Sequence, residues 1–310
     1  MTKVFIDGSV GTTGLRINQR LSERKDIQLN ILPDSLRKDP DARKEAINSA
    51  DIVFLCLPDP AAIEAAQMLE NPNTVVIDTS TAHSPDDMWT YGFPEIGGLL
   101  EKIKNSKRIA NPGCHASGFI SLVAPLTENG IIDANAHLTC FSLTGYSGGG
   151  KKMIADYENE ESAEMLLAPR AYGLSQTHKH LPEMAKICGL NNKPHFAPIV
   201  SSYYAGMEVT VPLFADQIKG NIDDIKEIYK NYYKGDIVKY CECADENGFL
   251  SASAFSGFDD MQISVFGNSE RITLVSRFDN LGKGASGSVI QNMNIVLGLD
   301  PSFGLNLGGK

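Results

Sequence analysis

The residue best placed to act as a nucleophile is Cys114, in the segment N-P-G-C-H-A-S-G at 111–118. Asn-Pro-Gly favours a tight turn, and the apolar stretch that follows predicts a helix. A helix N-terminus lowers the pKa of a thiol, because its dipole and free N–H groups stabilise the thiolate. The same amides suit the oxyanion of an attacked carbonyl. The alternative is a buried cysteine that opens a core helix, and the polar, tightly turned setting favours the reactive thiol.

A second polar segment, T-H-K-H-L-P-E at 177–183, supplies candidates for acid–base chemistry. A thiol mechanism needs a group that accepts and later donates a proton near neutral pH, and histidine can do both. His178 and His180 share a face in an extended segment and diverge in a helix, so the pattern leaves both open. Glu183 is placed to cap a helix at 183–188 or to orient an imidazole. The alternative is a surface loop with two solvated histidines. His115 adjoins Cys114 on the predicted helix, where neighbouring side chains diverge, so we expect it to be structural.

A glycine-rich turn, G-S-V-G-T-T-G at 8–14, follows an apolar predicted strand at 3–7 and precedes a predicted helix at 15–23. Glycines at this junction permit a tight turn, close approach of the backbone to a pyrophosphate and close packing of the helix. The helix N-terminus then offers N–H groups to the phosphates. An ordinary glycine-rich turn is the alternative, and the position between strand and helix favours a dinucleotide site. The predicted cofactor-binding residues of this turn are Gly8, Ser9, Gly11, Thr12, Thr13 and Gly14.

The segment after the second predicted strand, I-L-P-D-S-L-R-K at 31–38, bears on the choice of cofactor. Asp34 is a candidate for the ribose hydroxyl of NAD. Arg37 and Lys38 suit a 2′-phosphate, and we therefore predict NADP. The alternative is that these two cations are solvated charges at a helix start.

The elements that position these residues change character along the chain. Up to about residue 114, apolar strands alternate with helices, which predicts a parallel, doubly wound sheet of the Rossmann type. The segments 137–143, 207–213 and 261–276 are more alternating and predict an α+β domain with a mixed or antiparallel sheet. The expected division is 1–114 for the cofactor domain, 115–286 for a catalytic and dimerisation domain, and 287–310 for a C-terminal helix and tail that return to the first domain.

The composition of the chain argues against two classes of binding partner. A net charge of −10 over 310 residues argues against a nucleic acid and against an anionic membrane surface. Six cysteines without a C-x-x-C pair fit a reducing compartment, and no cluster has the spacing of metal ligands. The chain opens directly into a predicted strand and contains no run of about 18 apolar residues, so we expect a cytoplasmic protein without a signal peptide or membrane span.

These motifs together resemble the short form of the N-acetyl-gamma-glutamyl-phosphate reductase family. Further matches follow in the family's order: D-T-S-T-A-H at 78–83, W-T-Y-G-F-P-E at 89–95, T-G-Y-S-G-G-G-K-K at 144–152 and N-L-G-K-G-A-S-G at 280–287. The resemblance covers nearly the whole chain. One departure is Ser84, where the family pattern leads us to expect an arginine.

The resemblance implies roles for individual residues. Cys114 is the implied nucleophile, His180 is favoured over His178 as acid–base, and Glu183 supports the imidazole. The implied cofactor residues, beyond the turn and the 37–38 pair, are Ser80, Ser147, Gly148, Asn280 and Lys283. The implied substrate residues are Asn111, Ser117, Lys151 and Arg170.

The implied reaction is NADPH-dependent reduction of N-acetylglutamyl phosphate through a thioester on Cys114, as a step of arginine biosynthesis in a homo-oligomer (dimer or tetramer). Two alternatives stay open. One is aspartate-semialdehyde dehydrogenase, which shares the thioester logic but acts on a shorter substrate. The other is a non-catalytic protein that senses NADP, which would need the glycine turn but neither the cysteine nor the histidine motif.

Overall fold

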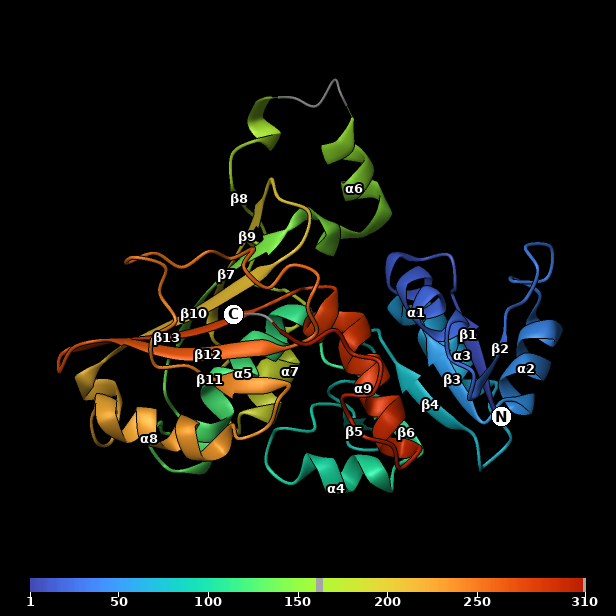
Figure 1. Ribbon diagram of the computed structural model, residues 1–310, viewed down its shortest axis with the longest axis horizontal. Coiled ribbons are helices and arrows are strands. Elements are labelled where there is room, and N and C mark those ends of the chain that lie inside the picture. The colour runs from blue at the N-terminus through green and yellow to red at the C-terminus, as the bar shows by residue number, and fades with distance from the viewer. Residues whose placement is uncertain (160–163, 309–310) are drawn as a thin grey trace. The chain divides into compact units, whose positions relative to one another are not determined.

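The computed structural model describes residues 1–159 and 164–308, which divide into two compact units (Figure 1). The first unit comprises Met1–Pro94, Gly98–Gly113 and Ala285–Gly304. The second comprises Glu95–Gly97, Cys114–Gly284 and the residues from Leu305 onward. The chain thus passes from the first unit to the second at Cys114 and returns at Ala285.

The first unit is built on a six-stranded sheet of order β2-β1-β3-β4-β6-β5, in which every pairing is parallel. The predicted Rossmann-type sheet is therefore confirmed. Its strands are β1 (Thr2–Asp7), β2 (Ile27–Asn30), β3 (Ile52–Leu55), β4 (Val75–Asp78), β5 (Thr90–Tyr91) and β6 (Arg108–Ala110). Its helices are α1 (Thr12–Ser22), α2 (Pro40–Ser49), α3 (Asp59–Gln67), α4 (Leu99–Lys104) and α9 (Gly287–Val296).

The strand order of this sheet reverses at β1. The chain runs from β1 to β2 on one side and then crosses to β3 on the other side of β1. Ligands of open parallel sheets bind outside the carboxyl ends of the strands at such a reversal. The turn at Gly8 lies there, immediately after β1.

The second unit is built on a seven-stranded mixed sheet of order β11-β12-β13-β10-β7-β9-β8. The β7–β9 and β11–β12 pairs are parallel, and the other four pairs are antiparallel. This confirms the predicted second sheet. Its strands are β7 (Thr139–Gly145), β8 (Arg170–Ala171), β9 (His195–Ser201), β10 (Met207–Phe214), β11 (Val238–Tyr240), β12 (Met261–Gly267) and β13 (Arg271–Phe278). The segment 261–276 folds as a hairpin, because Asn268 accepts hydrogen bonds from the backbone N–H groups of Glu270 and Arg271 and turns the chain.

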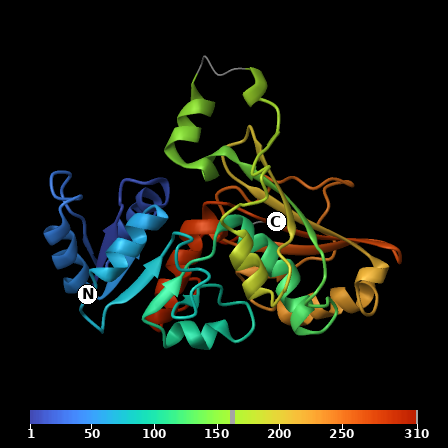
Figure 2. The ribbon, with the colours of Figure 1, turned by 180° about the vertical axis from the view of Figure 1, so that it is seen from behind.

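Helix α5 is the central helix of the second unit. It packs on β10 and β13 and also contacts α7 and α8; Figure 2 shows α5 in green beside α7 in yellow-green. The helices of this unit are α5 (Cys114–Glu128), α6 (Gly150–Glu158), α7 (Leu181–Ile187) and α8 (Ile222–Tyr232). Within residues 1–159 and 164–308, no helix has both the length and the apolar character needed to cross a membrane.

Gly118 allows α5 to lie close to the sheet. A Cβ built on Gly118 would lie 2.3 Å from a methyl carbon of Val209 and 3.0 Å from the ring of Phe278. Real Cβ atoms do not approach neighbours so closely, so any larger residue would push the helix away from the sheet. The glycine of the N-P-G-C-H-A-S-G motif therefore fixes the height of Cys114, one turn earlier, above the sheet.

Two tyrosines, one within α8 and one directly after it, donate hydrogen bonds to backbone carbonyls near a proline in α5. Pro125 has no N–H, so the carbonyl of Ser121 loses its usual intrahelical partner. The buried hydroxyl of Tyr233 donates to that carbonyl at 2.6 Å, and the hydroxyl of Tyr229 donates to the carbonyl of Leu122. The tyrosine hydroxyls thus supply hydrogen bonds to carbonyls of α5 around the proline, and these bonds connect α8 to α5.

We expect Tyr233→Phe to lower the free energy of unfolding by about 1–3 kcal/mol, because it leaves the buried carbonyl of Ser121 without a partner. Tyr204→Phe is the matched control, since Tyr204 is half exposed. Thermal and denaturant unfolding of both variants measure the difference, and equal stabilities would contradict this role of Tyr233.

Candidate active site

Cys114 lies at the first residue of α5, as the motif predicts. The backbone N–H of His115 hydrogen-bonds the sulfur and favours the thiolate, but loss of solvation is the larger effect and raises the pKa of the Cys114 thiol to about 11. Glu183 raises the pKa further, and Lys179 opposes it. The expectation of a lowered pKa is therefore wrong: removal from water outweighs the helix N-terminus at this position.

Three histidines gather around the start of α5. The ring centroids of His115 and His178 are 5.6 Å apart, those of His115 and His180 are 5.6 Å apart, and those of His178 and His180 are 4.7 Å apart. Burial lowers the pKa of all three imidazoles, that of His115 to about 3. The cluster is therefore neutral near pH 7, and neutral imidazoles are able to accept a proton.

Both ring nitrogens of His115 are engaged in hydrogen bonds. Nδ1 lies 2.6 Å from the hydroxyl oxygen of Ser142, and Nε2 lies 2.6 Å from that of Tyr172. His115 therefore has no nitrogen left for a substrate proton, which agrees with its expected structural role. Tyr172 and Ser142 are residues that the sequence analysis missed. Ser142 lies on β7 and Tyr172 in the loop after β8, and no short-range pattern links either of them to Cys114.

His178 and His180 differ in what their Nδ1 atoms contact. Nδ1 of His178 accepts a hydrogen bond from the backbone N–H of His180 at 3.2 Å. Nδ1 of the buried His180 has no hydrogen-bond partner among the described residues. Nε2 of His180 lies 4.0 Å from Oε1 of Glu183, in the first turn of α7, which is too far for a hydrogen bond but close enough for an ion pair once the imidazole is protonated. His180 thus presents an uncommitted nitrogen, whereas His178 holds the backbone of the turn.

A second group of predicted residues lies in the same unit, at the turn after β7. Nδ2 of Asn280 donates to Oγ of Ser147 at 3.0 Å, and Oδ1 of Asn280 accepts from the N–H of Gly206 at 2.9 Å. A Cβ built on Gly148 would lie 3.5 Å from the Asn280 amide. The structure thus brings Ser147, Gly148 and Asn280 together.

Lys283 is close to Asn280 in sequence but has a different partner. Its ammonium group is buried and pairs with Oε2 of Glu95 at 2.8 Å. Burial lowers the pKa of Lys283, and Glu95 opposes that shift. The charge of Lys283 thus holds the Glu95–Gly97 segment to the second unit.

The predicted substrate residues are dispersed. Lys151 is exposed at the start of α6, and Ser117 is buried in α5. Arg170 lies over the ring of Tyr157 at 5.3 Å and donates to its hydroxyl, while its buried Nε has no partner among the described residues. Asn111 belongs to the first unit, where its Oδ1 accepts from Nδ2 of Asn292 at 3.1 Å.

Ser80 and Ser84 sit in a polar loop after β4. The hydroxyl of Ser80 donates to the fully buried carboxylate of Asp78 at 2.7 Å. The same carboxylate lies 2.6 Å from Nδ1 of His83, whose ring stacks on Trp89 at 4.0 Å. Ser84, at the position of the expected arginine, is buried, and its hydroxyl has no partner among the described residues.

A cavity of about 400 Å³ opens at the carboxyl end of β1 in the first unit. The glycine turn, the end of β2 and the start of α3 all contribute to its wall. The charged residues that line it are Asp7, Arg37, Lys38, Arg43 and Glu64. The two predicted cations therefore face the same cavity as the glycine turn. Arg43 was missed by the sequence analysis, and it is buried against Asp7, with Nη2 3.0 Å from Oδ2.

The three glycines of the turn meet different constraints. A Cβ on Gly8 would lie 2.3 Å from the carbonyl oxygen of Cys56, and Gly8 has a φ of +87°. A Cβ on Gly14 would lie 2.4 Å from the carbonyl oxygen of Gly8. A Cβ on Gly11 would meet nothing nearer than 3.5 Å. The protein's own packing therefore requires glycine at 8 and 14 but not at 11, where the free space suits a ligand that approaches the backbone.

Two family models match this chain. The model described as "Semialdehyde dehydrogenase, NAD binding domain" matches residues 16–106, and "Semialdehyde dehydrogenase, dimerisation domain" matches residues 114–280. Among solved structures, aspartate semialdehyde dehydrogenase II of Vibrio cholerae, complexed with ASA, superposes with a TM-score of 0.71 at 14% identity, over 96% of this chain and 98% of that one. Aspartate semialdehyde dehydrogenase of Francisella tularensis gives 0.71 at 16% identity, over 96% and 100%. At these identities the structures establish the fold.

Full-length relatives are more similar in sequence. N-acetyl-gamma-glutamyl-phosphate reductase 2 of Nostoc sp. is 40% identical over 98% of this chain and 99% of its own length. N-acetyl-gamma-glutamyl-phosphate reductase of Brucella ovis is 40% identical over 96% and 99%. The order of motifs, the two units and these relatives agree, and the chain belongs to the N-acetyl-gamma-glutamyl-phosphate reductase family of nicotinamide-dependent oxidoreductases.

Proposed function

We propose that this protein reduces N-acetyl-L-glutamyl 5-phosphate to N-acetyl-L-glutamate 5-semialdehyde and phosphate with NADPH, in arginine biosynthesis. The observation that carries the proposal is Cys114 at the start of α5, beside a buried cluster of neutral histidines. Relatives at 40% identity carry the name of this reductase, whereas the aspartate semialdehyde dehydrogenases at 14–16% identity support the fold alone. This favours the longer, acetylated substrate over aspartyl phosphate.

The protonation states define the first chemical step. Because burial holds the thiol neutral, Cys114 has to lose its proton as it attacks the acyl carbon and expels phosphate. A neutral imidazole is the acceptor, and His180 offers the uncommitted Nδ1. Glu183 then stabilises the imidazolium that forms, and the N–H groups at the start of α5 bind the developing oxyanion. The product of this step is a thioester on Cys114.

The second step is reduction of the thioester. The first unit would hold NADPH, whose chemistry here would be donation of hydride to the thioester carbon. The imidazolium of His180 gives its proton to the alkoxide that hydride addition leaves, which makes the thiohemiacetal. The neutral ring then takes back the hydroxyl proton as the carbon–sulfur bond breaks and the semialdehyde is released. Transfer of that proton from His180 to the sulfur of Cys114 restores the thiol and the neutral imidazole.

The residues of the first unit fit the dinucleotide. The backbone at Gly11, where a Cβ would meet only ordinary contacts at 3.5 Å and beyond, and the N–H groups at the start of α1 suit the pyrophosphate. Arg37 and Lys38 line the adjoining cavity and suit a 2′-phosphate, which distinguishes NADP from NAD. Arg43 is buried between Asp7 and Glu64. Arg37 forms only an exposed pair with Asp34 at 3.6 Å, so the cations at 37 and 38 are better placed than Arg43 to meet a ligand phosphate.

Phosphate-dependent oxidation of N-acetylglutamate 5-semialdehyde tests the proposal directly. We expect formation of NADPH from NADP only when phosphate is present, and a kcat/KM for NADP at least about tenfold higher than for NAD. Arg37→Ala with Lys38→Ala should remove most of that preference without loss of kcat with NAD. Activity confined to aspartate semialdehyde would support the shorter-substrate alternative, and no activity with either aldehyde would support a sensor of NADP.

The glycine turn yields a paired prediction. Gly11→Ala should fold with an unchanged melting temperature but bind NADPH at least about tenfold more weakly, because its methyl group occupies space left for the pyrophosphate. Gly14→Ala should lower the melting temperature, because its methyl group would overlap the carbonyl of Gly8. Fluorescence titration and thermal unfolding measure the two effects, and a Gly11→Ala variant with normal affinity would refute this placement of the cofactor.

The raised pKa predicts the pH dependence of thiol reactivity in the free enzyme. Between pH 7 and pH 10 the thiolate fraction of a thiol with a pKa of about 11 rises about tenfold per unit. The rate constant for alkylation of Cys114 by iodoacetamide should rise in the same way, with Cys114→Ser as the blank. A plateau that begins below pH 7 would indicate a thiolate at rest and would contradict the proton transfer from Cys114 to His180.

A further inference from the structure

The connection between β11 and β12, residues 241–260, contains neither helix nor strand. Loops longer than about 12–15 residues without secondary structure are uncommon in compact domains and usually have a function. We refer to residues 241–258 as the strap. Nothing in the chemistry proposed above uses it.

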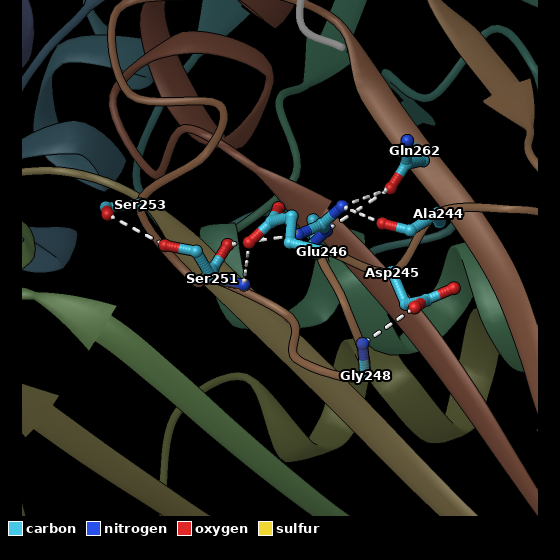
Figure 3. Close-up of polar contacts among 8 residues, drawn as sticks. Ala244, Asp245, Glu246, Gly248, Ser251, Ser253 and Gln262 are labelled. Carbon is cyan, nitrogen blue, oxygen red and sulfur yellow. Dashed lines mark hydrogen bonds and ion pairs between the residues drawn. The ribbon is translucent and has the colours of Figure 1, made fainter.

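Arg277, from β13, is hydrogen-bonded to the strap at three points, and Figure 3 labels its partners Ala244, Glu246 and Ser251. Its Nη1 donates to the carboxylate of Glu246 at 2.6 Å and to the carbonyl of Ser251 at 3.4 Å, and its Nη2 donates to the carbonyl of Ala244 at 2.8 Å. Nε and Nη2 also donate to Oε1 of Gln262, on the neighbouring strand β12, at 3.2 and 2.8 Å. Arg277 is only 2% exposed. The N–H donors of its guanidinium group thus connect the strap to the sheet.

The strap also contains hydrogen bonds between its own residues. The second carboxylate oxygen of Glu246 accepts the backbone N–H of Ser251 at 3.1 Å, and the Ser251 hydroxyl lies 3.1 Å from that of Ser253. Asp245 accepts the backbone N–H of Gly248 at 2.8 Å. Glu246 thus links the fold of the strap to its attachment at Arg277.

Residues 252 and 253 of the strap pack closely against Gly206. A Cβ on Gly206 would lie 2.5 Å from the carbonyl oxygen of Ala252 and 2.7 Å from Cα of Ser253. Gly206 donates its N–H to Asn280 and accepts the N–H of Gly145 at 3.0 Å. Asn280 in turn donates to Ser147. The strap therefore rests directly on the residue that joins Asn280 to the turn at 145–148.

The other end of the strap is hydrogen-bonded to the segment 279–284, which packs against Cys114. The N–H of Gly257 donates to Oδ2 of Asp279 at 2.6 Å, and Oδ1 of Asp279 accepts the N–H of Leu281 at 2.6 Å. A Cβ on Gly284, three residues further along the chain, would lie 3.0 Å from Cβ of Cys114. The strap thus touches both the 145–148 turn and the 279–284 segment.

We propose that Arg277 is a positioning residue: by fastening the strap, it holds in place the 145–148 turn and the 279–284 segment, which carry the predicted cofactor residues Ser147, Gly148, Asn280 and Lys283. This inference rests on the proposed function for the identity of that cofactor, which is NADP. The coupling from Arg277 to the two segments is a property of the second unit and stands whether or not the chain has reductase activity.

Hydrogen exchange of the ligand-free full chain, followed by mass spectrometry, tests the coupling. Arg277→Lys keeps the charge but loses the fork, so amides in 241–258, 145–148 and 279–284 should exchange roughly tenfold faster, and those of β1 should not change. Arg271→Lys is the matched control on the same strand, because Arg271 forms an exposed pair with Glu270 at 3.2 Å. Glu246→Gln, at a half-exposed side chain, should give a smaller change of the same pattern and serves if Arg277→Lys does not fold.

Kinetics provide the second measurement. Arg277→Lys should raise the KM for NADP in semialdehyde oxidation by about threefold or more and change kcat by less than about twofold. Faster exchange confined to the strap, or no change in exchange, would overturn the proposal. An unchanged KM for NADP in an active variant would also overturn it, since a merely structural role of Arg277 alters stability without altering cofactor binding.

Discussion

The site depends on one constraint, which is that the thiol of Cys114 and the imidazoles beside it lie largely out of water: His115 and His180 are buried, and Cys114 and His178 are half-buried. Burial disfavours the charged form of each group, so the thiol and the histidines are neutral at rest. In the proposed mechanism, charge appears only when the substrate binds and the proton moves from sulfur to nitrogen. The tight turn before Cys114 and the close approach of Gly118 to the sheet impose this burial, because they fix the start of α5 above the mixed sheet.

Buried polar side chains, rather than regular packing alone, hold the irregular segments of each unit. Asp78 organises the loop after β4, Asp279 and Arg277 organise the second unit's long connections, and Tyr233 compensates for Pro125. Each such group would be costly without its partners. These interactions therefore specify single conformations for loops that local propensity would leave undetermined.

The sequence predicts what depends on neighbours along the chain. The β1–turn–α1 unit, the parallel sheet, and a cysteine at a helix start all follow from local spacing and apolar pattern. It does not predict partners that tertiary folding brings together, such as Tyr172 and Ser142 on His115, Glu95 on Lys283, or the strap on Arg277. The direction of the Cys114 pKa shift was mispredicted for the same reason, because the helix end is a local feature whereas the burial that outweighs it is not.

The central claim is that Cys114 forms a covalent bond with the acyl group before any reduction occurs. Rapid mixing of the enzyme with N-acetylglutamyl phosphate in the absence of nucleotide isolates that step. The account predicts a burst of one phosphate per chain and a peptide containing Cys114 whose mass has increased by one N-acetylglutamyl group. Absence of a burst and of any modified peptide, or attachment of the acyl group to another residue, would contradict it.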